Sequence, residues 1–461
     1  MHKDGEKILP YARVGLDASN HRGEEGLGIG FVNPETGKIE VRREMGLVRD
    51  SHVFDKRIFG SLLIGHTRYR TSSTCSMENL QPIPFSLKDG TTAAISHNGN
   101  ITNDRELLKK VLKKEQKGIS DTKVIGMLLG QNLGKKKDVD AVRESLSRVV
   151  GSYSMVVLVG GERPRVLVIR DPYGYMPLRI GRNRDGFFVA SESVAFGNKY
   201  LNAASRDVAP GEMVVMDQKG MVTYQLFERK REQHCMFQAV YMYRPDSQFE
   251  GKSVAEIREK LGFEVAGRYR PDVNIIIPIP ETGWDIGLGY SRATGIPIRR
   301  GVVRDRYESG RSFMRGDQLS REKVVNRKLN VIPEIVRGKH VLITEDSLVR
   351  GTTMKGMINE IRAAGAEEIH VAFSCPPITD ECRYGIDFYN DKLIARSFKG
   401  RPAEEINREI AKEIGADSVY YQTMDGLIDA LAVSREKLCL SCLTGVYVQP
   451  GSFMTEEERK K

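Results

Sequence analysis

The sequence predicts a fold in two parts, an antiparallel α+β domain followed by an α/β domain with a parallel sheet. The length of 461 residues leaves room for two or three domains. In the first half, short apolar runs are separated by glycine, asparagine and aspartate, a pattern typical of antiparallel strands joined by turns. In the second half, continuous apolar runs alternate with helical stretches, which favours a parallel sheet covered on both faces.

Five short apolar runs are the expected strands of the first half, and two helices are expected among them. Three of the runs lie between residues 150 and 200, with the spacing of an antiparallel sheet. The strands are expected at residues 62–64, 93–96, 155–159, 166–169 and 187–190, and the helices near 104–114 and 121–131.

The second half is expected to begin where the pattern changes, in the charged stretch 228–236. We therefore predict domains at residues 1–229 and 230–445, and a C-terminal tail at 446–461 whose final charge run is a solvated end. The expected strands are 273–277, 341–344 and 370–373, and the expected helices include 354–364 and 404–414.

Composition narrows the class of protein. Hydrophobic residues at 40% and charged residues at 29% are ordinary globular usage, which excludes wholesale disorder. The net charge of +10 fits either nucleic acid or an anionic small substrate. The sequence contains no run of 18 or more apolar residues, so no membrane span is predicted. The first residues lack the apolar core of a signal peptide. Six cysteines are too few for a disulfide scaffold, so we expect a reducing, cytoplasmic setting.

The most informative segment is residues 341–353, with sequence VLITEDSLVRGTT. An apolar strand ends in two carboxylates, and a short turn with Gly351 leads into a helix. Backbone N–H groups at such a turn bind phosphate, and hydroxyls from Thr352 and Thr353 add donors. The adjacent Glu345 and Asp346 suit sugar hydroxyls or Mg²⁺. An ordinary turn with an acidic cap is the alternative for the acidic pair alone.

This string resembles the ribose-phosphate loop of type I phosphoribosyltransferases, and residues 277–283 (IPIPETG) look like that fold's pyrophosphate loop. Residues 243–247, 251–258 and 416–418 are similar to one family in particular, glutamine phosphoribosylpyrophosphate amidotransferase. The resemblance implies Mg²⁺ at Thr282, Glu345 and Asp346. It implies phosphoribosyl pyrophosphate binding at Glu281, Thr282, Gly283, Glu345, Asp346, Ser347, Arg350, Gly351, Thr352 and Thr353. Glu345 departs from the family, which has Asp there.

Residues 304–328 contain eight Lys or Arg and four Asp or Glu. The charge alone is typical of a solvated loop. In the family, the corresponding loop orders over bound substrate and builds an ammonia channel, and Arg306, Tyr307, Arg321 and Lys328 match family positions. A basic loop would stabilise the charge that develops on a leaving diphosphate.

The N-terminal half resembles the class II glutamine amidotransferase domain, an N-terminal-nucleophile sandwich of two antiparallel sheets. Its motifs include residues 20–26 (NHRGEEG) and, in chain order, three that carry site residues, at 65–71, 97–100 and 120–122. The resemblance implies that Arg68 binds the glutamine carboxylate, that Asn98 and Gly99 form the oxyanion hole, and that Asp121 holds the α-ammonium group. Taken alone, residues 97–100 (HNGN) are more typical of a hairpin turn. Met176 replaces a usual Arg.

The nucleophile of this fold is missing from the sequence. The family uses an N-terminal Cys whose α-amino group is the base, whereas this chain begins Met-His and the first, central strand is absent. Cys75, the only cysteine of this half, is expected to be structural. Two explanations stay open, a lost glutaminase or an upstream extension that begins with Cys-Gly after processing. We favour the extension, because Arg68, Asn98, Gly99 and Asp121 all remain.

Four cysteines form a further pattern. Cys439 and Cys442 form a C-x-x-C pair, and two thiolates from one tight turn suit a cluster. Buried free cysteines are the alternative for scattered cytosolic thiols. One branch of the family carries a [4Fe–4S] cluster in the contexts of Cys235, Cys382, Cys439 and Cys442, so the resemblance implies that cluster here. Cys375 matches none of these contexts and is expected in the core.

The whole pattern predicts an amidophosphoribosyltransferase-like enzyme of purine synthesis. It would make phosphoribosylamine from phosphoribosyl pyrophosphate and ammonia, with glutamine as the ammonia source if an N-terminal Cys is present. Purine nucleotide inhibitors and a homo-oligomer are expected from the family, and neither nucleic acid nor a membrane is expected as a partner. Two alternatives are an ammonia-only transferase with a dead glutaminase domain and a non-catalytic regulator that binds phosphoribosyl pyrophosphate.

Overall fold

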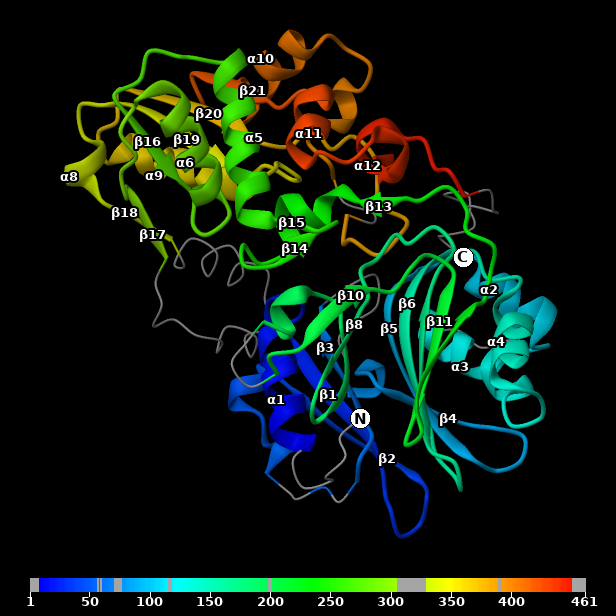
Figure 1. Cartoon of the computed structure of the whole chain (residues 1–461). Helices are drawn as coiled ribbons and strands as arrows, with labels where there is room; N and C mark the ends of the chain where they lie inside the picture. The colour runs from blue at the N-terminus through cyan, green and yellow to red at the C-terminus, as the bar shows by residue number, and fades with distance from the viewer. Residues whose placement is uncertain are drawn as a thin grey trace.

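The computed structural model describes residues 8–55, 58, 60–69, 77–114, 118–197, 201–304, 329–388 and 392–449. The first half of the chain forms a layered body of strands with helices outside it, and the second half packs against one end of this body (Figure 1). None of the helices in these ranges is both long and apolar enough to cross a membrane.

A six-stranded antiparallel sheet forms the larger layer of the first domain, in the order β12-β11-β7-β6-β5-β4. Its outer face packs on two helices, where Ile95 and Met155 meet Ile125 and Val142. The strands are β4 (Ile83–Ser86), β5 (Thr92–Ile101), β6 (Gly151–Val159), β7 (Arg165–Arg170), β11 (Glu212–Asp217) and β12 (Gly220–Gln225), and the helices are α3 (Asp121–Asn132) and α4 (Asp138–Leu146).

Two three-stranded antiparallel sheets, β2-β1-β3 and β10-β8-β9, form the facing layer. Ile64 and Ile180 from this layer pack against Val168 and Val214 of the larger sheet, and so form the core of a sandwich. Leu9 and Leu16 of α1 (Ile8–Ala18) pack on the outside of β1. The strands are β1 (Gly26–Val32), β2 (Ile39–Met45), β3 (Leu63–Arg68), β8 (Arg179–Asn183), β9 (Gly186–Ala190) and β10 (Ala204–Asp207).

A four-stranded parallel sheet, β16-β19-β20-β21, forms the centre of the second domain. Successive side chains of its strands alternate between two cores, because a strand has a period of two. Ile343 and Val371 pack with Ile358 and Ile410 on one face, whereas Leu342 and Ala372 pack with α5 and α6 on the other. The elements are β16 (Ile275–Pro278), β19 (His340–Glu345), β20 (Glu368–Phe373), β21 (Ser418–Tyr421), α5 (Val254–Arg268), α6 (Gly283–Thr294), α9 (Thr352–Ala363) and α10 (Ala403–Ile414).

Short elements complete the described fold. Two-residue strands β13 (His234–Cys235) and β22 (Leu438–Cys439) pair in parallel where the two domains meet. The remaining strands and α-helices are β14 (Gln248–Phe249), β15 (Lys252–Ser253), β17 (Val302–Arg304), β18 (Leu329–Val331), α2 (Asp104–Glu106), α8 (Pro333–Val336), α11 (Met424–Leu431) and α12 (Ser441–Thr444), and the short π-helices are η6 (Leu107–Val111) and η8 (Gln238–Met242).

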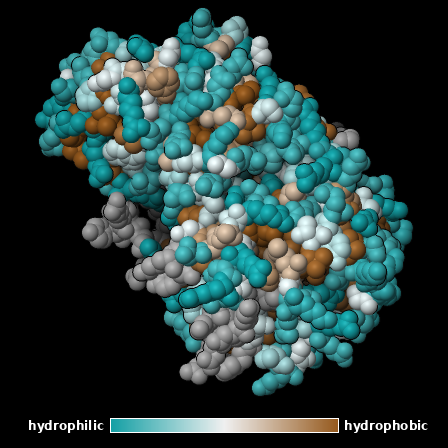
Figure 2. Space-filling view, viewed as in Figure 1, coloured by the Kyte–Doolittle hydropathy of each residue, from teal (hydrophilic) through white to brown (hydrophobic). Residues whose placement is uncertain are grey.

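The two-part fold is confirmed, with one local correction. The run 187–190 does not join 155–159 and 166–169 in one sheet, because it forms β9 of the facing layer. The hairpin turn that residues 97–100 suggest when taken alone does not form, because they continue β5 and pair with β6 from His97 opposite Met155 to Asn100 opposite Ser152. The space-filling view shows a mostly hydrophilic face with hydrophobic side chains in several small groups (Figure 2).

At the start of the expected tail, Tyr447 and Gln449 make contacts with the rest of the chain. The Gln449 side chain is buried and its Oε1 accepts a hydrogen bond from Gly151 N at 3.0 Å. Tyr447 donates its hydroxyl to the Glu381 carbonyl at 2.6 Å. The charge run 456–461 lies outside the described residues, and the domain boundary at residue 229 stays a prediction.

Candidate functional site

A hydroxyl joins two carboxylates at the carboxyl ends of β16 and β19. Thr282 Oγ1 donates to Asp346 Oδ2 at 2.6 Å and lies 3.0 Å from Glu345 Oε1. Parallel neighbours β16 and β19 end at the same edge of the sheet, which is where ligands bind in open α/β folds. Burial and the adjacent Asp346 carboxyl both raise the pKa of Glu345 well above its ordinary value, because they disfavour a second negative charge. A divalent cation would relieve that repulsion.

Two helices begin at this edge. α6 begins at Gly283, which has no room for a side chain because a Cβ there would lie 2.3 Å from the Thr344 carbonyl oxygen. α9 begins after Gly351, whose φ of +82° is a left-handed conformation that favours glycine. Thr352 and Thr353 are exposed in the first turn of α9, and Arg350 is exposed just before it. The turn therefore presents free N–H groups of a helix start and two hydroxyls to solvent.

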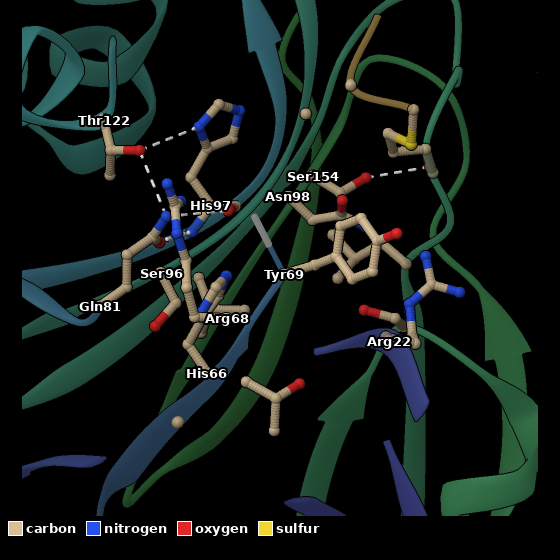
Figure 3. Close-up of a pocket in the computed structure, with 18 of the residues that line it drawn as sticks. Arg22, His66, Arg68, Tyr69, Gln81, Ser96, His97, Asn98, Thr122 and Ser154 are labelled. Atoms are coloured by element: carbon tan, nitrogen blue, oxygen red, sulfur yellow. Dashed lines mark hydrogen bonds between the residues drawn. The ribbon is translucent and has the colours of Figure 1, made fainter. Parts of the chain in front are cut away.

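A cavity of about 1680 Å³ lies between the two layers of the first domain and extends to Arg350 and Cys382 of the second domain. Arg68, Asn98, Gly99 and Asp121, which lie far apart in the sequence, all line it. Figure 3 shows Arg68 and His66 on one strand and Ser96, His97 and Asn98 on the neighbouring layer around this space. The structure therefore brings the four residues predicted for glutamine into one cavity.

The local geometry at Asn98 and Gly99 is that of a hydrogen-bond donor site. Asn98 Nδ2 is buried and has no hydrogen-bond partner among the described residues, so it is available to an oxyanion. Gly99 has φ of +146°, and a Cβ there would lie 2.2 Å from the Ser152 carbonyl oxygen. Glycine is therefore required, and it brings the backbone to the cavity wall.

Asp121 begins α3, directly after Ser120, which caps the helix by accepting from Lys123 N. Asp121 Oδ2 accepts from Ile101 N at 3.2 Å, and His97 Nδ1 lies 3.7 Å from the same oxygen. On the other side, burial lowers the pKa of His66 to about 3, with Arg68 and His97 as further causes. The cavity thus holds an acidic residue on one wall and a neutral imidazole beside Arg68 on another.

Open sheet edges face the same cavity. In the described part of the chain β3 pairs with β1 alone and β9 with β8 alone, so each has one edge without a strand partner. Residues of both strands line the cavity, among them Ile64, His66, Phe188 and Val189. A further strand placed in this space could pair with both unpaired strand edges.

Cys382 is the only cysteine among the described lining residues of this cavity. Burial raises the pKa of its thiol to about 11, with Cys439 as the next cause, so the reactive thiolate is disfavoured. The described lining residues therefore supply no activated thiol beside Asn98. Cys75 lies outside the described residues.

The four cysteines of the predicted cluster surround a second, small cavity of about 10 Å³. Cys235 and Cys439 lie opposite each other in the parallel pair of β13 and β22. Burial raises the pKa of each of the four thiols. No group of three or more His, Cys, Asp or Glu side chains is placed to hold a metal ion in the ranges that the structure describes. Cys375 is fully buried and does not line the cavity.

None of the sequence motifs pointed to Glu192 as an important residue. Its carboxylate is fully buried between the domains, where it meets His21, Arg22 and Ser247. No motif marked it, and only its burial in the folded chain identifies it. Arg306, Tyr307, Arg321 and Lys328, predicted for the basic loop, lie outside the described residues.

Comparisons with known proteins identify a family for each half of the chain. The glutamine amidotransferase domain family matches residues 66–198, and the phosphoribosyl transferase domain family matches residues 251–395. The amidophosphoribosyltransferase of Methanocaldococcus jannaschii is 35% identical over 95% of this chain and 94% of its own, and that of Bacillus subtilis is 34% identical over 97% and 92%.

Solved structures give the same result. The glutamine phosphoribosylpyrophosphate amidotransferase of B. subtilis, solved with ADP and GMP, has a TM-score of 0.85 and 33% identity, and covers 97% of this chain and 96% of its own. A structure described as the allosteric regulatory enzyme of purine biosynthesis has a TM-score of 0.86 and 32% identity over 98% and 96%. The chain therefore belongs to the amidophosphoribosyltransferase family.

Proposed function

We propose that the second domain binds phosphoribosyl pyrophosphate at the carboxyl ends of β16 and β19 and exchanges its pyrophosphate for ammonia. The ammonia nitrogen forms a bond to C1 of the ribose as the C1–O bond breaks, and pyrophosphate leaves with the bonding electrons. The nitrogen loses one proton, which leaves phosphoribosylamine. The single observation that carries this proposal is Thr282 bridging Glu345 and Asp346 beside two helix starts.

The residues at the carboxyl ends of β16 and β19 would bind different parts of the substrate and its metal ion. A hydroxyl and two carboxylates are the oxygen donors that Mg²⁺ prefers, so Thr282, Glu345 and Asp346 would hold it. When bound, Mg²⁺ neutralises charge that develops on the diphosphate. Gly351, Thr352 and Thr353 would bind the 5′-phosphate at the start of α9. The remaining predicted residues, Glu281, Gly283, Ser347 and Arg350, flank these groups, and the basic residues of 304–328 would close over the leaving group.

Pyrophosphate release tests this assignment directly. With NH₄⁺, Mg²⁺ and phosphoribosyl pyrophosphate, the full chain should release pyrophosphate, and Asp346→Asn should lower the rate by roughly 100-fold or more. Asp417→Asn is the matched control, because Asp417 lies in the same domain and pairs with Arg362 at the surface. Binding of the substrate with no release by the unmodified chain would contradict the enzyme and favour the regulator.

We propose further that the first domain binds glutamine through Arg68 and Asp121 and stabilises the oxyanion at Asn98 and Gly99. Hydrolysis would need an extended segment in the cavity between β3 and β9, with an N-terminal Cys whose α-amino group is the base. The two unpaired strand edges and the lack of an activated thiol among the described lining residues support this requirement.

Two measurements separate this proposal from the ammonia-only alternative. Intact mass of the protein from its source should exceed that of the 461-residue chain, and the longer form should hydrolyse glutamine and lose that activity to an electrophilic glutamine analogue. The 461-residue chain should bind glutamine without hydrolysing it. A native mass equal to that of the 461 residues would contradict the extension and favour an ammonia-only transferase.

We propose that the small cavity at the domain junction holds a [4Fe–4S] cluster. Thiolates are the ligands that such clusters take, and the four thiols line one cavity of their own. Cys235, Cys382, Cys439 and Cys442 would be the ligands. The cluster would act as a structural or oxygen-sensing clasp, with no electron transfer in the reaction.

Regulation by purine nucleotides is proposed from the relatives. The B. subtilis enzyme is described as a complex with ADP and GMP, and the second solved structure as an allosteric regulatory enzyme. We expect purine nucleotides to inhibit pyrophosphate release by this chain. The expected homo-oligomer stays a prediction, which mass measurement of the native protein in solution would check.

A further inference from the structure

Residues 382–387 form a wall between the two cavities. Cys382, Arg383 and Ile386 line both the large cavity of the first domain and the small four-cysteine cavity. The segment belongs to the second half of the chain, yet it reaches the strands that carry Asn98 and Gly99. We name this segment the strap.

Three contacts fix the strap to β5 and β6. Asn100 Nδ2 donates to the Arg383 carbonyl at 2.9 Å, and Ser152 Oγ donates to the Tyr384 carbonyl at 2.6 Å. Gly385 packs so closely that a Cβ there would lie 3.0 Å from Gly99 Cα and from its carbonyl carbon. The peptide predicted to stabilise the oxyanion therefore rests directly on the strap.

Other contacts fix the strap to the cysteine cavity. The backbone N–H groups of Tyr384 and Ile386 both donate to Cys382 Sγ at 3.4 Å. Each of these bonds would strengthen with negative charge on the sulfur, as in a metal-bound thiolate, because hydrogen bonds to charged acceptors are stronger. The Tyr384 ring also stacks on Tyr175, with centroids 4.0 Å apart.

We propose that the strap couples the four-cysteine cavity to the oxyanion peptide at Gly99, so that loading of the cavity holds that peptide in place. This inference rests on the proposed roles of Asn98 and Gly99 in glutamine hydrolysis. Coupling between two binding sites is reciprocal, so glutamine should in turn slow the loss of iron from the cavity. Asn100, Ser152 and Gly385 are then positioning residues, which act on the site through Gly99.

The first experiment uses the metal-free full chain, so that it does not depend on the cluster. Cys382→Ala removes the sulfur that accepts from Tyr384 and Ile386. Amide hydrogen exchange in residues 98–101 should accelerate by roughly 5- to 150-fold, the usual range of coupling, while residues 93–95 of the same strand keep their rates. Cys375→Ala is the matched control, because Cys375 is a free thiol of the same domain, more deeply buried than Cys382, that does not line the cavity. Equal exchange in the two variants would overturn the proposal.

The second experiment compares metal-free protein with protein loaded anaerobically with ferrous iron and sulfide. Loading should slow exchange in residues 98–101, and Ser152→Ala should abolish most of that difference. Ser154→Ala is the control, since Ser154 lies on the same strand and donates to the Met176 carbonyl at 2.9 Å instead of to the strap. Ser152→Ala also removes the acceptor of the hydrogen bond from Asn100 N. That loss is present in both the metal-free and the loaded form of the variant, so it cancels when the two forms are compared.

The outcomes separate the strap from the cluster and from glutamine hydrolysis. If the chain takes up no iron but Cys382→Ala still accelerates exchange, the strap is supported and the cluster is contradicted. If iron is taken up while exchange in residues 98–101 stays unchanged, the coupling is overturned and the cluster is kept. If Cys382→Ala does not fold, the comparison of Ser152→Ala with Ser154→Ala decides alone. Exchange is a readout that does not require activity.

Discussion

At the scale of single residues, the carboxylate of Glu192 joins the two domains. One oxygen accepts from Arg22 Nη1 at 2.6 Å and lies 2.8 Å from His21 Nε2, and the other accepts from Ser247 Oγ at 2.8 Å. Burial alone would raise the pKa of this carboxyl, but Arg22 and His21 outweigh it and hold the pKa at about 2. The carboxyl therefore stabilises the folded state fully above pH about 4.5, its ordinary pKa, and loses that effect as the pH falls toward 2.

We predict that Glu192→Gln lowers the free energy of unfolding at neutral pH by about 3–5 kcal/mol, because removal of one partner leaves the charge of Arg22 buried. The difference from the unmodified chain should shrink between pH 4.5 and pH 2. Urea unfolding at a series of pH values measures both effects. Glu212→Gln should cost less, because its partner Arg206 is about half exposed. A loss for Glu192→Gln that does not change with pH would contradict the argument.

The residues discussed above differ in how far the sequence could predict their roles. Thr282, Glu345 and Asp346 were predictable because a strand, a turn and a helix start fix their geometry within a few residues. Glu192 was not, because its partners lie 170 residues before it and 52–55 residues after it. Gly385 was missed for the same reason, since its neighbour Gly99 lies far away in the sequence.

At the scale of secondary structure, α5 and α6 lie in direct backbone contact through two glycines. A Cβ at Gly262 would lie 1.9 Å from the Ile286 carbonyl oxygen, and a Cβ at Gly289 would lie 1.8 Å from that of Glu259. The contact matters for the site because α6 begins at Gly283, directly after Thr282. Any side chain at Gly262 must therefore push the helix that positions the proposed metal-binding hydroxyl.

We predict that Gly262→Ala lowers the free energy of unfolding by roughly 1–3 kcal/mol through overpacking and reduces pyrophosphate release. Gly267→Ala in the same helix has open space around its Cβ and should instead stabilise the chain by about 0.5–1 kcal/mol, the helix propensity gain of alanine over glycine. Thermal unfolding and the ammonia-dependent assay measure the two effects. Equal behaviour of the two variants would contradict the close helix contact.

Most elements of the fold followed from apolar runs and helical spacing, whereas the strand partners of two segments did not. Residues 97–100 contain an Asn-Gly pair with turn propensity, yet pairing with nine successive positions of β6 keeps β5 extended. Residues 187–190 have the same apolar pattern as the strands before them, and only pairing with β8 puts them in the facing layer. Strand partners are tertiary information, which local pattern does not contain.

At the scale of the whole molecule, one hydrophobic core crosses the domain junction. It joins Tyr175 and Met176 of the first domain to Phe237, Tyr384 and the four cluster cysteines of the second. The large cavity also crosses the junction, since Arg350, next to the phosphate-binding turn, lines it together with Arg68. The sequence indicated the glutamine site and the phosphate-binding turn separately. It did not indicate that residues next to the two sites line one cavity, because no motif spans the two domains.

This architecture makes the four cysteines a fastening point for the whole chain. They come from residues 235, 382 and 439–442, so a bound cluster would link three distant stretches of the chain, and the strap would connect the cluster to β6.

We predict that anaerobically purified protein is brown, contains about four irons per chain and unfolds at a lower temperature after chelation, because metal-binding free energy adds to folding free energy. Cys442→Ser should lose iron and folded yield, whereas Cys375→Ser should keep its iron. Iron and sulfide analysis with thermal unfolding measures this, and colourless protein without either element after anaerobic purification would contradict the cluster.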